Sequence, residues 1–186
     1  MKGHIFNLLE DFIIDVAGDE KLFEIFDRCS FDTSKSFVRT ENYPDAQLIE
    51  IVTHAVAVLC IDVPTAQFAF GKWLYPRLIK LLPAEFTDFS HPAPVLYKLD
   101  ELHKVELKKL YPDAIPPAFD YVVKDPTHAE LIYCSPRRMF DLVAGVLQGM
   151  AEHYGVAIEC HITRGWQNDP DKAQFALTYD KPQSVI

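Results

Sequence analysis

The sequence lacks the features of a membrane-bound or nucleic-acid-binding protein. No apolar run approaches the roughly 18 residues of a membrane span, and the amino terminus has neither the basic start nor the cleavage site of a signal peptide. Eighteen Lys and Arg stand against 27 Asp and Glu, a net charge of −9, whereas phosphate binding requires clustered basic residues. We therefore expect a cytoplasmic protein that binds neither membranes nor nucleic acid.

The motifs of common enzyme classes are also missing. The chain has no His-Glu-x-x-His, no Gly-x-Ser-x-Gly and no phosphate-binding glycine loop. The four cysteines are Cys29, Cys60, Cys134 and Cys160. They form no Cys-x-x-Cys pair, so free thiols in a reducing cytosol are the expectation. His153 and His161 lack the spacing of a metal pair. We therefore predict that the protein is not an enzyme.

What the chain does contain is ample apolar material for one domain with a large core. Its 186 residues are 49% hydrophobic and 12% aromatic. Helical spacing predicts helices over 2–17, 20–28, 44–60, 64–82, 94–111 and 137–153, and Pro76 should kink or end the fourth. A two-residue period predicts strands over 118–124, 128–135, 156–164 and 174–180. The order indicates an α+β fold with one four-stranded antiparallel sheet.

Three polar side chains meet at the end of strand 128–135. The two-residue period puts Tyr133 and Ser135 on one face, and Pro136 turns the chain so that Arg137 lies at the mouth of the next helix. Two hydroxyls and a guanidinium suit a pair of carboxylates such as heme propionates. The same spacing also occurs at ordinary strand ends, so alone it is a weak motif.

One histidine, His103, lies within the apolar stripe of the helix expected over 94–111. The other members of the stripe are Leu96, Leu99, Leu107 and Leu110. A histidine in such a stripe is more often a core residue satisfied by a backbone carbonyl than a metal ligand. The group formed by Tyr133, Ser135 and Arg137, called the anion clamp below, follows thirty residues later. A buried heme needs an iron ligand and a site for its carboxylates, so the combination favours His103 as an iron ligand.

Three stretches together resemble the heme nitric oxide/oxygen binding (H-NOX) family, which includes the heme domain of soluble guanylate cyclase and stand-alone bacterial gas sensors. They are MKGHIFNLL at 1–9, HKVELKKLYPDA at 103–114, and Tyr133-x-Ser135-x-Arg137. They occur in the family's order and spacing, and the resemblance extends from Met1 to about Tyr179. It implies a helical distal lobe at about 1–62, a proximal lobe with the sheet at 63–186, and heme between them.

The resemblance also implies roles for individual residues. His103 would be the axial ligand of a heme b, held non-covalently because Cys-x-x-Cys-His is absent, and the Tyr-x-Ser-x-Arg residues would hold its propionates. Pro116 matches the family's proline that presses on the porphyrin. The candidate distal pocket is apolar and consists of Ile5, Leu9, Leu74, Leu78 and Leu142.

An apolar pocket predicts which gas the protein binds. Oxygen-binding relatives supply a distal tyrosine where this chain has Leu142, and such a donor stabilises bound dioxygen by about 1.5–3 kcal/mol. We therefore expect binding of NO, and of CO, without stable binding of O₂. Tyr75 is the one nearby hydroxyl that would change this expectation if its helix were turned differently.

Some bacterial relatives hold zinc through cysteines and a histidine in the carboxyl-terminal part. Only His161 fits here, because Met139, Arg164 and Lys172 stand where cysteines are needed, so we expect no zinc.

The resemblance implies a switch in signalling. NO would weaken the bond between iron and His103, and the signal would pass to a separate protein, a histidine kinase or a cyclic-di-GMP enzyme, because the sequence ends soon after the sheet. We expect a monomer. The alternative is a non-enzymatic adaptor, or a module that binds another tetrapyrrole or an apolar ligand in the same cavity.

Overall fold

The computed structural model describes residues 1–110, 112, 113 and 115–183 and divides the chain into two compact units, Met1–Phe70 and Gly71–Ile186. The division falls within helix α4 (Val63–Leu78), whereas the sequence placed the boundary near residue 62. Each unit has its own hydrophobic contacts.

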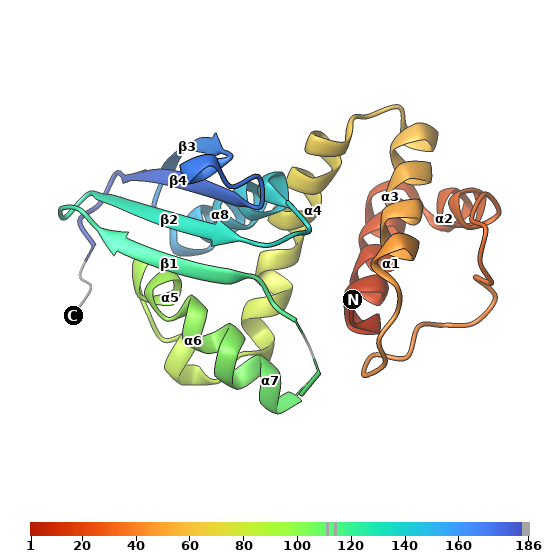
Figure 1. Ribbon diagram of the computed structural model, residues 1–186, viewed down its shortest axis with the longest axis horizontal. Helices are drawn as coiled ribbons and strands as arrows, with labels where there is room; N and C mark the ends of the chain where they lie inside the picture. Colours follow the sequence, from red (N-terminus) through yellow and green to blue (C-terminus); the bar gives the residue numbers. More distant parts are fainter. Residues whose placement is uncertain (111, 114, 184–186) are drawn as a thin grey trace. The chain divides into compact units, whose positions relative to one another are not determined.

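Unit 1 is helical and contains α1 (Gly3–Ala17), α2 (Asp19–Phe26), α3 (Asp45–Leu59) and the start of α4 (Figure 1). The buried apolar residues of α1, α2 and α3 are Phe6, Leu8, Leu9, Phe12, Ile13, Leu22, Ile25, Leu48, Ile51 and Ala55. The irregular segment between α2 and α3 is held by Phe37, whose ring lies 4.3 Å from that of Phe6. Gly3 is needed at the start of α1, because a Cβ there would lie 2.2 Å from the carbonyl oxygen of Val38.

Unit 2 contains the sheet. Strands β1 (Ala118–Val123), β2 (His128–Cys134), β3 (Ile158–Arg164) and β4 (Lys172–Tyr179) are antiparallel and lie in the order β1-β2-β4-β3. The α+β fold with a four-stranded antiparallel sheet is thus confirmed, and each strand boundary lies within two residues of the prediction. The alternation that predicted the strands also orients them, because Ala129, Leu131 and Tyr133 of β2 are all buried.

Helices of unit 2 cover the buried face of the sheet. Helix α8 (Phe140–Tyr154) connects β2 to β3, and α5 (Ala93–Tyr97), α6 (Leu99–Glu101) and α7 (Leu107–Leu110) follow one another along β1 (Figure 1). The short 3₁₀ turns are η1 (Ile79–Leu81), η2 (Ala84–Phe86) and η4 (Trp166–Asn168). One core joins the helices to the sheet; its largest members include Leu96, Leu131, Phe140, Leu147, Met150, Phe175 and Tyr179.

Three predicted helices are shorter or more broken than the sequence pattern indicated. Helix α8 begins at Phe140 instead of at residue 137, because Arg138 has a left-handed backbone (φ 49°) that cannot extend a helix. The helix expected over 94–111 is interrupted at Lys98 (φ −86°, ψ −1°) and continues as a π-helical turn, η3 (Leu102–Glu106). Helix α4 runs only two residues past Pro76 before the 3₁₀ turn η1.

Helices α4 and α8 cross with their backbones in close contact. A Cβ on Gly71 of α4 would lie 2.1 Å from the carbonyl oxygen of Leu142 on α8. A Cβ on Gly149 of α8 would in turn lie 2.8 Å from the carbonyl oxygen of Lys72. Leu74 follows Gly71 by three residues and therefore lies on the same side of α4. Two predicted pocket residues, Leu74 and Leu142, thus belong to helices that are in direct contact.

No single helix in the described residues is long and apolar enough to span a membrane. Only α3 combined with the run from Val63 to Leu81 meets the criteria of length and composition, and this pair is bent by 106°.

Candidate functional site

The histidine predicted as a ligand, His103, is held in one orientation by its own helical segment. Its Nδ1 lies 2.8 Å from the carbonyl oxygen of Leu99. A carbonyl only accepts hydrogen bonds, so Nδ1 carries the proton and Nε2 keeps a lone pair. Among the residues that the structure describes, none forms a hydrogen bond with Nε2. Burial lowers the pKa of the ring, which keeps the imidazole neutral, as a metal ligand must be.

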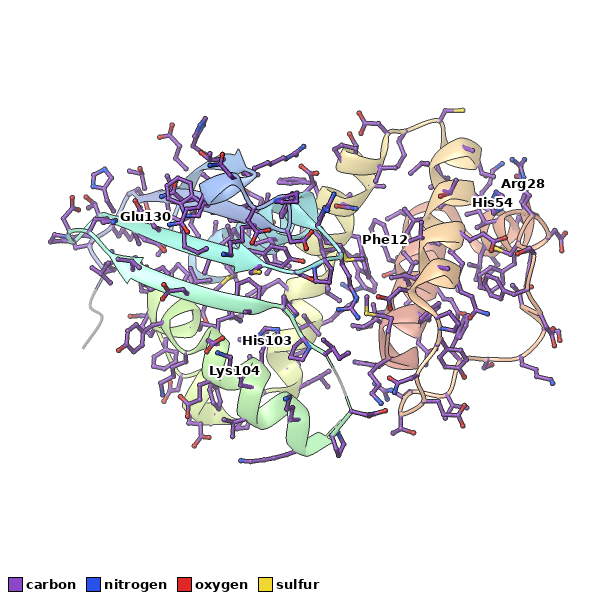
Figure 2. All side chains as sticks on the ribbon, viewed as in Figure 1. Phe12, Arg28, His54, His103, Lys104 and Glu130 are labelled. Carbon is purple, nitrogen blue, oxygen red and sulfur yellow. The ribbon has the colours of Figure 1, made fainter. Side chains whose placement is uncertain are left out.

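The segment that carries His103 has unusual backbone geometry. His103 is the second residue of the π-helical turn η3, and such turns are rare and occur frequently at functional sites. The preceding Asp100 accepts a hydrogen bond from the backbone N–H of Phe119 on β1 (3.4 Å) and forms an ion pair with Lys104 (2.6 Å). Figure 2 labels His103 and Lys104 on this segment. The segment is therefore tied directly to the first strand of the sheet.

A line of aromatic rings joins His103 to the strand-end motif. The ring of Phe119 lies 5.2 Å from that of His103 and 5.4 Å from that of Tyr133. Phe119 and Tyr133 are directly opposite each other in the β1–β2 register, which puts their side chains on one face. Phe140, at the start of α8, continues the line 5.7 Å from Tyr133. The structure thus brings the histidine and the anion clamp to the same end of the β1–β2 pair.

The three residues of the clamp are themselves in contact. Tyr133 and Ser135 are both buried, with 3% of each residue exposed. The backbone N–H of Arg137 donates to the Ser135 hydroxyl (3.3 Å), and its Nη1 donates to the carbonyl oxygen of Ile115 (2.9 Å). Burial raises the pKa of Tyr133, although Ser135 and the Met139 backbone act in the opposite direction. Both hydroxyls and the guanidinium therefore remain hydrogen-bond donors at neutral pH.

The proline predicted to contact the cofactor lies next to this clamp. Pro116 follows Ile115, whose carbonyl oxygen accepts the hydrogen bond from Arg137. Pro116 is partly buried, whereas Ile115 is 76% exposed. The neighbouring Arg138 forms an ion pair with Asp171 instead (2.8 Å). The two consecutive arginines therefore have different partners, and only Arg137 reaches the segment that carries Pro116.

The apolar residues predicted for the distal pocket come from both units. Leu74, Leu78 and Leu142 belong to unit 2, where Leu74 is buried and the other two are partly buried. Ile5 and Leu9 lie on α1 in unit 1; Leu9 is buried and Ile5 is partly buried.

The hydroxyl of Tyr75 already has a partner within unit 2. It donates a hydrogen bond to the hydroxyl of Tyr154 (3.3 Å), and the Tyr75 ring packs in the core beneath the sheet. Burial and the contact with Tyr154 both raise the pKa of Tyr75. The sequence did not decide where the Tyr75 hydroxyl lies. In the structure this hydroxyl is hydrogen-bonded to a residue of α8.

The residues aligned with the carboxyl-terminal zinc position have other partners. Arg164 forms an ion pair with Asp141 (2.6 Å), and Lys172 with Asp169 (3.3 Å). The expectation of no zinc at this position stays a prediction.

Sequence reasoning did not identify Phe119 or the carbonyl of Leu99 as parts of the site. The alternation of β1 could have put Phe119 on the same face as the buried Tyr121, which is a usable signal. The hydrogen bond from His103 to Leu99 was harder to predict, because the only indication in the sequence is the four-residue spacing of the two residues.

The arrangement can bind a flat, dianionic cofactor that contains a metal. A neutral imidazole can ligate iron, two buried hydroxyls and a guanidinium can bind two carboxylates, and aromatic rings can pack against a planar group, so the residues present fit heme.

Comparisons with known proteins agree with this chemistry. A family model described as Haem-NO-binding matches residues 2–162. The structure is similar to the unliganded Fe(II) H-NOX protein of K. algicida, with a TM-score of 0.86, 19% identity, and coverage of 100% of this chain and 99% of the other. It is also similar to the S. oneidensis H-NOX protein in its Fe(II)NO state, with a TM-score of 0.85, 23% identity, and coverage of 99% and 100%. No curated protein matches the sequence.

Proposed function

Since the chain belongs to the Haem-NO-binding (H-NOX) family of gas-sensor domains, we propose that it senses nitric oxide through a ferrous heme b and signals to a separate protein. The observation that carries the proposal is the state of His103. One ring nitrogen donates to the carbonyl of Leu99, and the other has no protein hydrogen-bond partner in the described residues. A neutral imidazole whose Nδ1–H is held by a backbone carbonyl and whose Nε2 keeps its lone pair is the form that binds a metal.

The remaining site residues have matching tasks. Heme, when bound, would supply an iron atom that can bind both a protein ligand and a gas. His103 Nε2 would be the protein ligand, with its tautomer set by Leu99. Tyr133, Ser135 and Arg137 would hold the propionates, with the hydroxyls donating single hydrogen bonds and the guanidinium neutralising charge. Pro116 would contact the porphyrin.

The side chains of the proposed distal pocket explain why the protein would prefer NO and CO to O₂. Leu74, Leu78 and Leu142, together with Ile5 and Leu9, offer no hydrogen-bond donor from their side chains. The hydroxyl of Tyr75 is engaged with Tyr154. Dioxygen depends on such a donor much more than NO or CO does, because it takes on negative charge when it binds. The protein therefore binds NO and CO and does not retain O₂.

The signal starts at the π-helical turn. His103 is covalently part of η3, and Asp100 connects the same segment to β1. Loss of the bond between His103 and a bound heme would free this segment to adopt a second arrangement. The two arrangements are two states whose populations the gas shifts. A histidine kinase or a cyclic-di-GMP enzyme reads this change, and the sensor acts as a monomer.

The first test is the absorption spectrum of the purified ferrous protein, recorded without oxygen, after addition of NO, and after exposure to air. We expect a Soret band typical of five-coordinate heme with one histidine. It should move to that of a five-coordinate NO form, because His103 leaves the iron. Air should give no stable oxygenated spectrum. A stable oxygenated form would refute the selectivity, and absence of any Soret band would favour the adaptor function.

Replacing Arg137 with glutamine should weaken heme binding without unfolding the protein. The guanidinium supplies charge-assisted hydrogen bonds, worth about 1.5–3 kcal/mol each when lost, so heme should dissociate about ten to a hundred times faster. The measurement is the rate of heme transfer to an excess of apomyoglobin. Arg138→Gln is the matched control, because Arg138 pairs with Asp171. Equal rates for the two variants would remove Arg137 from the clamp.

A further inference from the structure

Unit 1 contains a group of metal-binding side chains that plays no part in the heme site. Cys29 lies just after α2, and Glu50 and His54 lie one helical turn apart on α3. The Cys29 sulfur, a carboxylate oxygen of Glu50 and a ring nitrogen of His54 all lie within 4.8 Å of one another. His54 Nε2 is 3.8 Å from Glu50 Oε1. Figure 2 shows His54 and Arg28, the residue before Cys29, labelled in this part of the molecule.

The chemistry of this group selects a particular kind of metal. A thiolate and an imidazole are the ligands of Zn²⁺ and similar borderline metals, whereas Ca²⁺ and Mg²⁺ prefer oxygen ligands alone. A carboxylate oxygen is the third common zinc ligand. Three protein ligands leave one tetrahedral position, which water can fill because the side chains of Glu50 and His54 are 26% and 28% exposed. A metal ion therefore also has a path to the site from solvent.

A neighbouring residue already orients the carboxylate. Ser30 donates two hydrogen bonds to Glu50, from its backbone N–H to Oε1 (2.5 Å) and from its hydroxyl to Oε2 (3.0 Å). Partners of this kind hold the ligands of metal sites in place and raise their affinity. The neighbouring Arg28 forms an ion pair with Glu24 (2.7 Å). Ser30 therefore holds the Glu50 carboxylate in one orientation beside the other two ligands.

We propose that Cys29, Glu50 and His54 form a Zn²⁺ site that clamps the end of α2 to α3. The chain between these helices, residues 27–44, has no regular helix or strand. The metal joins residues on either side of this segment, and because the three ligands meet only in the folded protein, the free energy of zinc binding adds to the stability of the fold. The site stabilises unit 1 and does not depend on heme.

A redox role for Cys29 fits the surroundings less well. Burial and the charge of Glu50 raise the pKa of Cys29 to about 11, so the thiol is protonated at neutral pH and is a poor nucleophile. Zinc must displace that proton when it binds, as it does at other cysteine sites.

The test is calorimetric titration of the chelator-treated, heme-containing protein with Zn²⁺, followed by X-ray absorption at the zinc edge. We expect one ion per chain, one sulfur ligand at about 2.3 Å and nitrogen or oxygen ligands at about 2.0–2.2 Å. Cys29→Ser and His54→Ala should each weaken binding at least about tenfold. Glu50→Gln, which keeps the side chain's shape, should weaken it as well. Cys60→Ser is the matched control, because Cys60 is an exposed thiol in the same unit, and it should bind zinc normally.

Stability provides a second measurement. Zinc at a hundred times its dissociation constant should stabilise the folded protein by about 2.7 kcal/mol, and residues 27–44 should resist proteolysis. Absence of saturable binding below about 100 µM Zn²⁺ would overturn the proposal. So would unchanged affinity in the Cys29 and His54 variants, or a zinc spectrum without sulfur. The Soret band and its response to NO should be the same in all these variants, so failure of the zinc site and failure of the heme function are separable.

Discussion

Replacing His103 with alanine is expected to abolish the effect of NO on the protein even when added imidazole restores the iron ligand. In the proposed mechanism the side chain of His103 would link the iron to the π-helical turn η3, and the preceding Asp100 connects the same segment to β1. Free imidazole replaces the ligand but not the link. Binding of the gas then changes the iron without changing the backbone.

Hydrogen exchange provides a readout that needs no identified partner. In the wild-type protein NO should increase amide exchange over residues 99–110 and 118–123, because His103 is released and its segment loosens. In His103→Ala with imidazole this NO-dependent difference should fall to zero, while the Soret band shows that heme is still bound. His128→Ala is the control, because His128 is an exposed histidine on β2. An NO response that survives in His103→Ala would refute the switch.

Replacing Leu142 with tyrosine should convert the protein into one that binds oxygen. Leu142 lies where α8 crosses α4, and a Cβ on Gly71 would lie 2.1 Å from the carbonyl oxygen of Leu142. A hydroxyl at this position would donate to bound dioxygen and stabilise it by about 1.5–3 kcal/mol. Oxygen affinity should therefore rise by about one to two orders of magnitude, measured by titrating the ferrous protein with O₂ and following the Soret band.

The control is Leu142→Phe, which adds the same ring without the hydroxyl. Its oxygen affinity should stay close to that of the wild-type protein, and any effect of size alone will appear in both variants. If the two variants bind oxygen equally, the apolar character of the pocket is not what excludes O₂. Tyr75→Phe tests the remaining hydroxyl, and it should leave oxygen affinity unchanged because Tyr75 donates to Tyr154.

Much of the fold and part of the site follow from local patterns in the sequence. The two-residue period located all four strands, because strands with one buried face must alternate. The same period put Tyr133 and Ser135 on one side, and the structure shows that both are buried. His103 stood out because it interrupts a leucine stripe. These features depend on neighbours within a few residues, so the sequence alone reveals them.

Other features depend on backbone geometry that local patterns do not encode. A helical stripe does not distinguish an α-helix from the interrupted segment with its π-helical turn, because both place apolar residues every three or four positions. The start of α8 at Phe140 depends on the left-handed backbone of Arg138. Arginine rarely adopts this conformation, so the sequence does not predict it.

By itself the sequence determined the fold class and the order of the motifs, and it predicted which residues would hold a heme. Only the tertiary structure decided which groups meet across long separations. Tyr75 pairs with Tyr154 across 79 positions, and Cys29 lies beside Glu50 and His54 through the packing of α2 and α3. The physical reason is that hydrogen bonds and metal coordination act over a few ångströms, and packing alone brings such distant side chains that close.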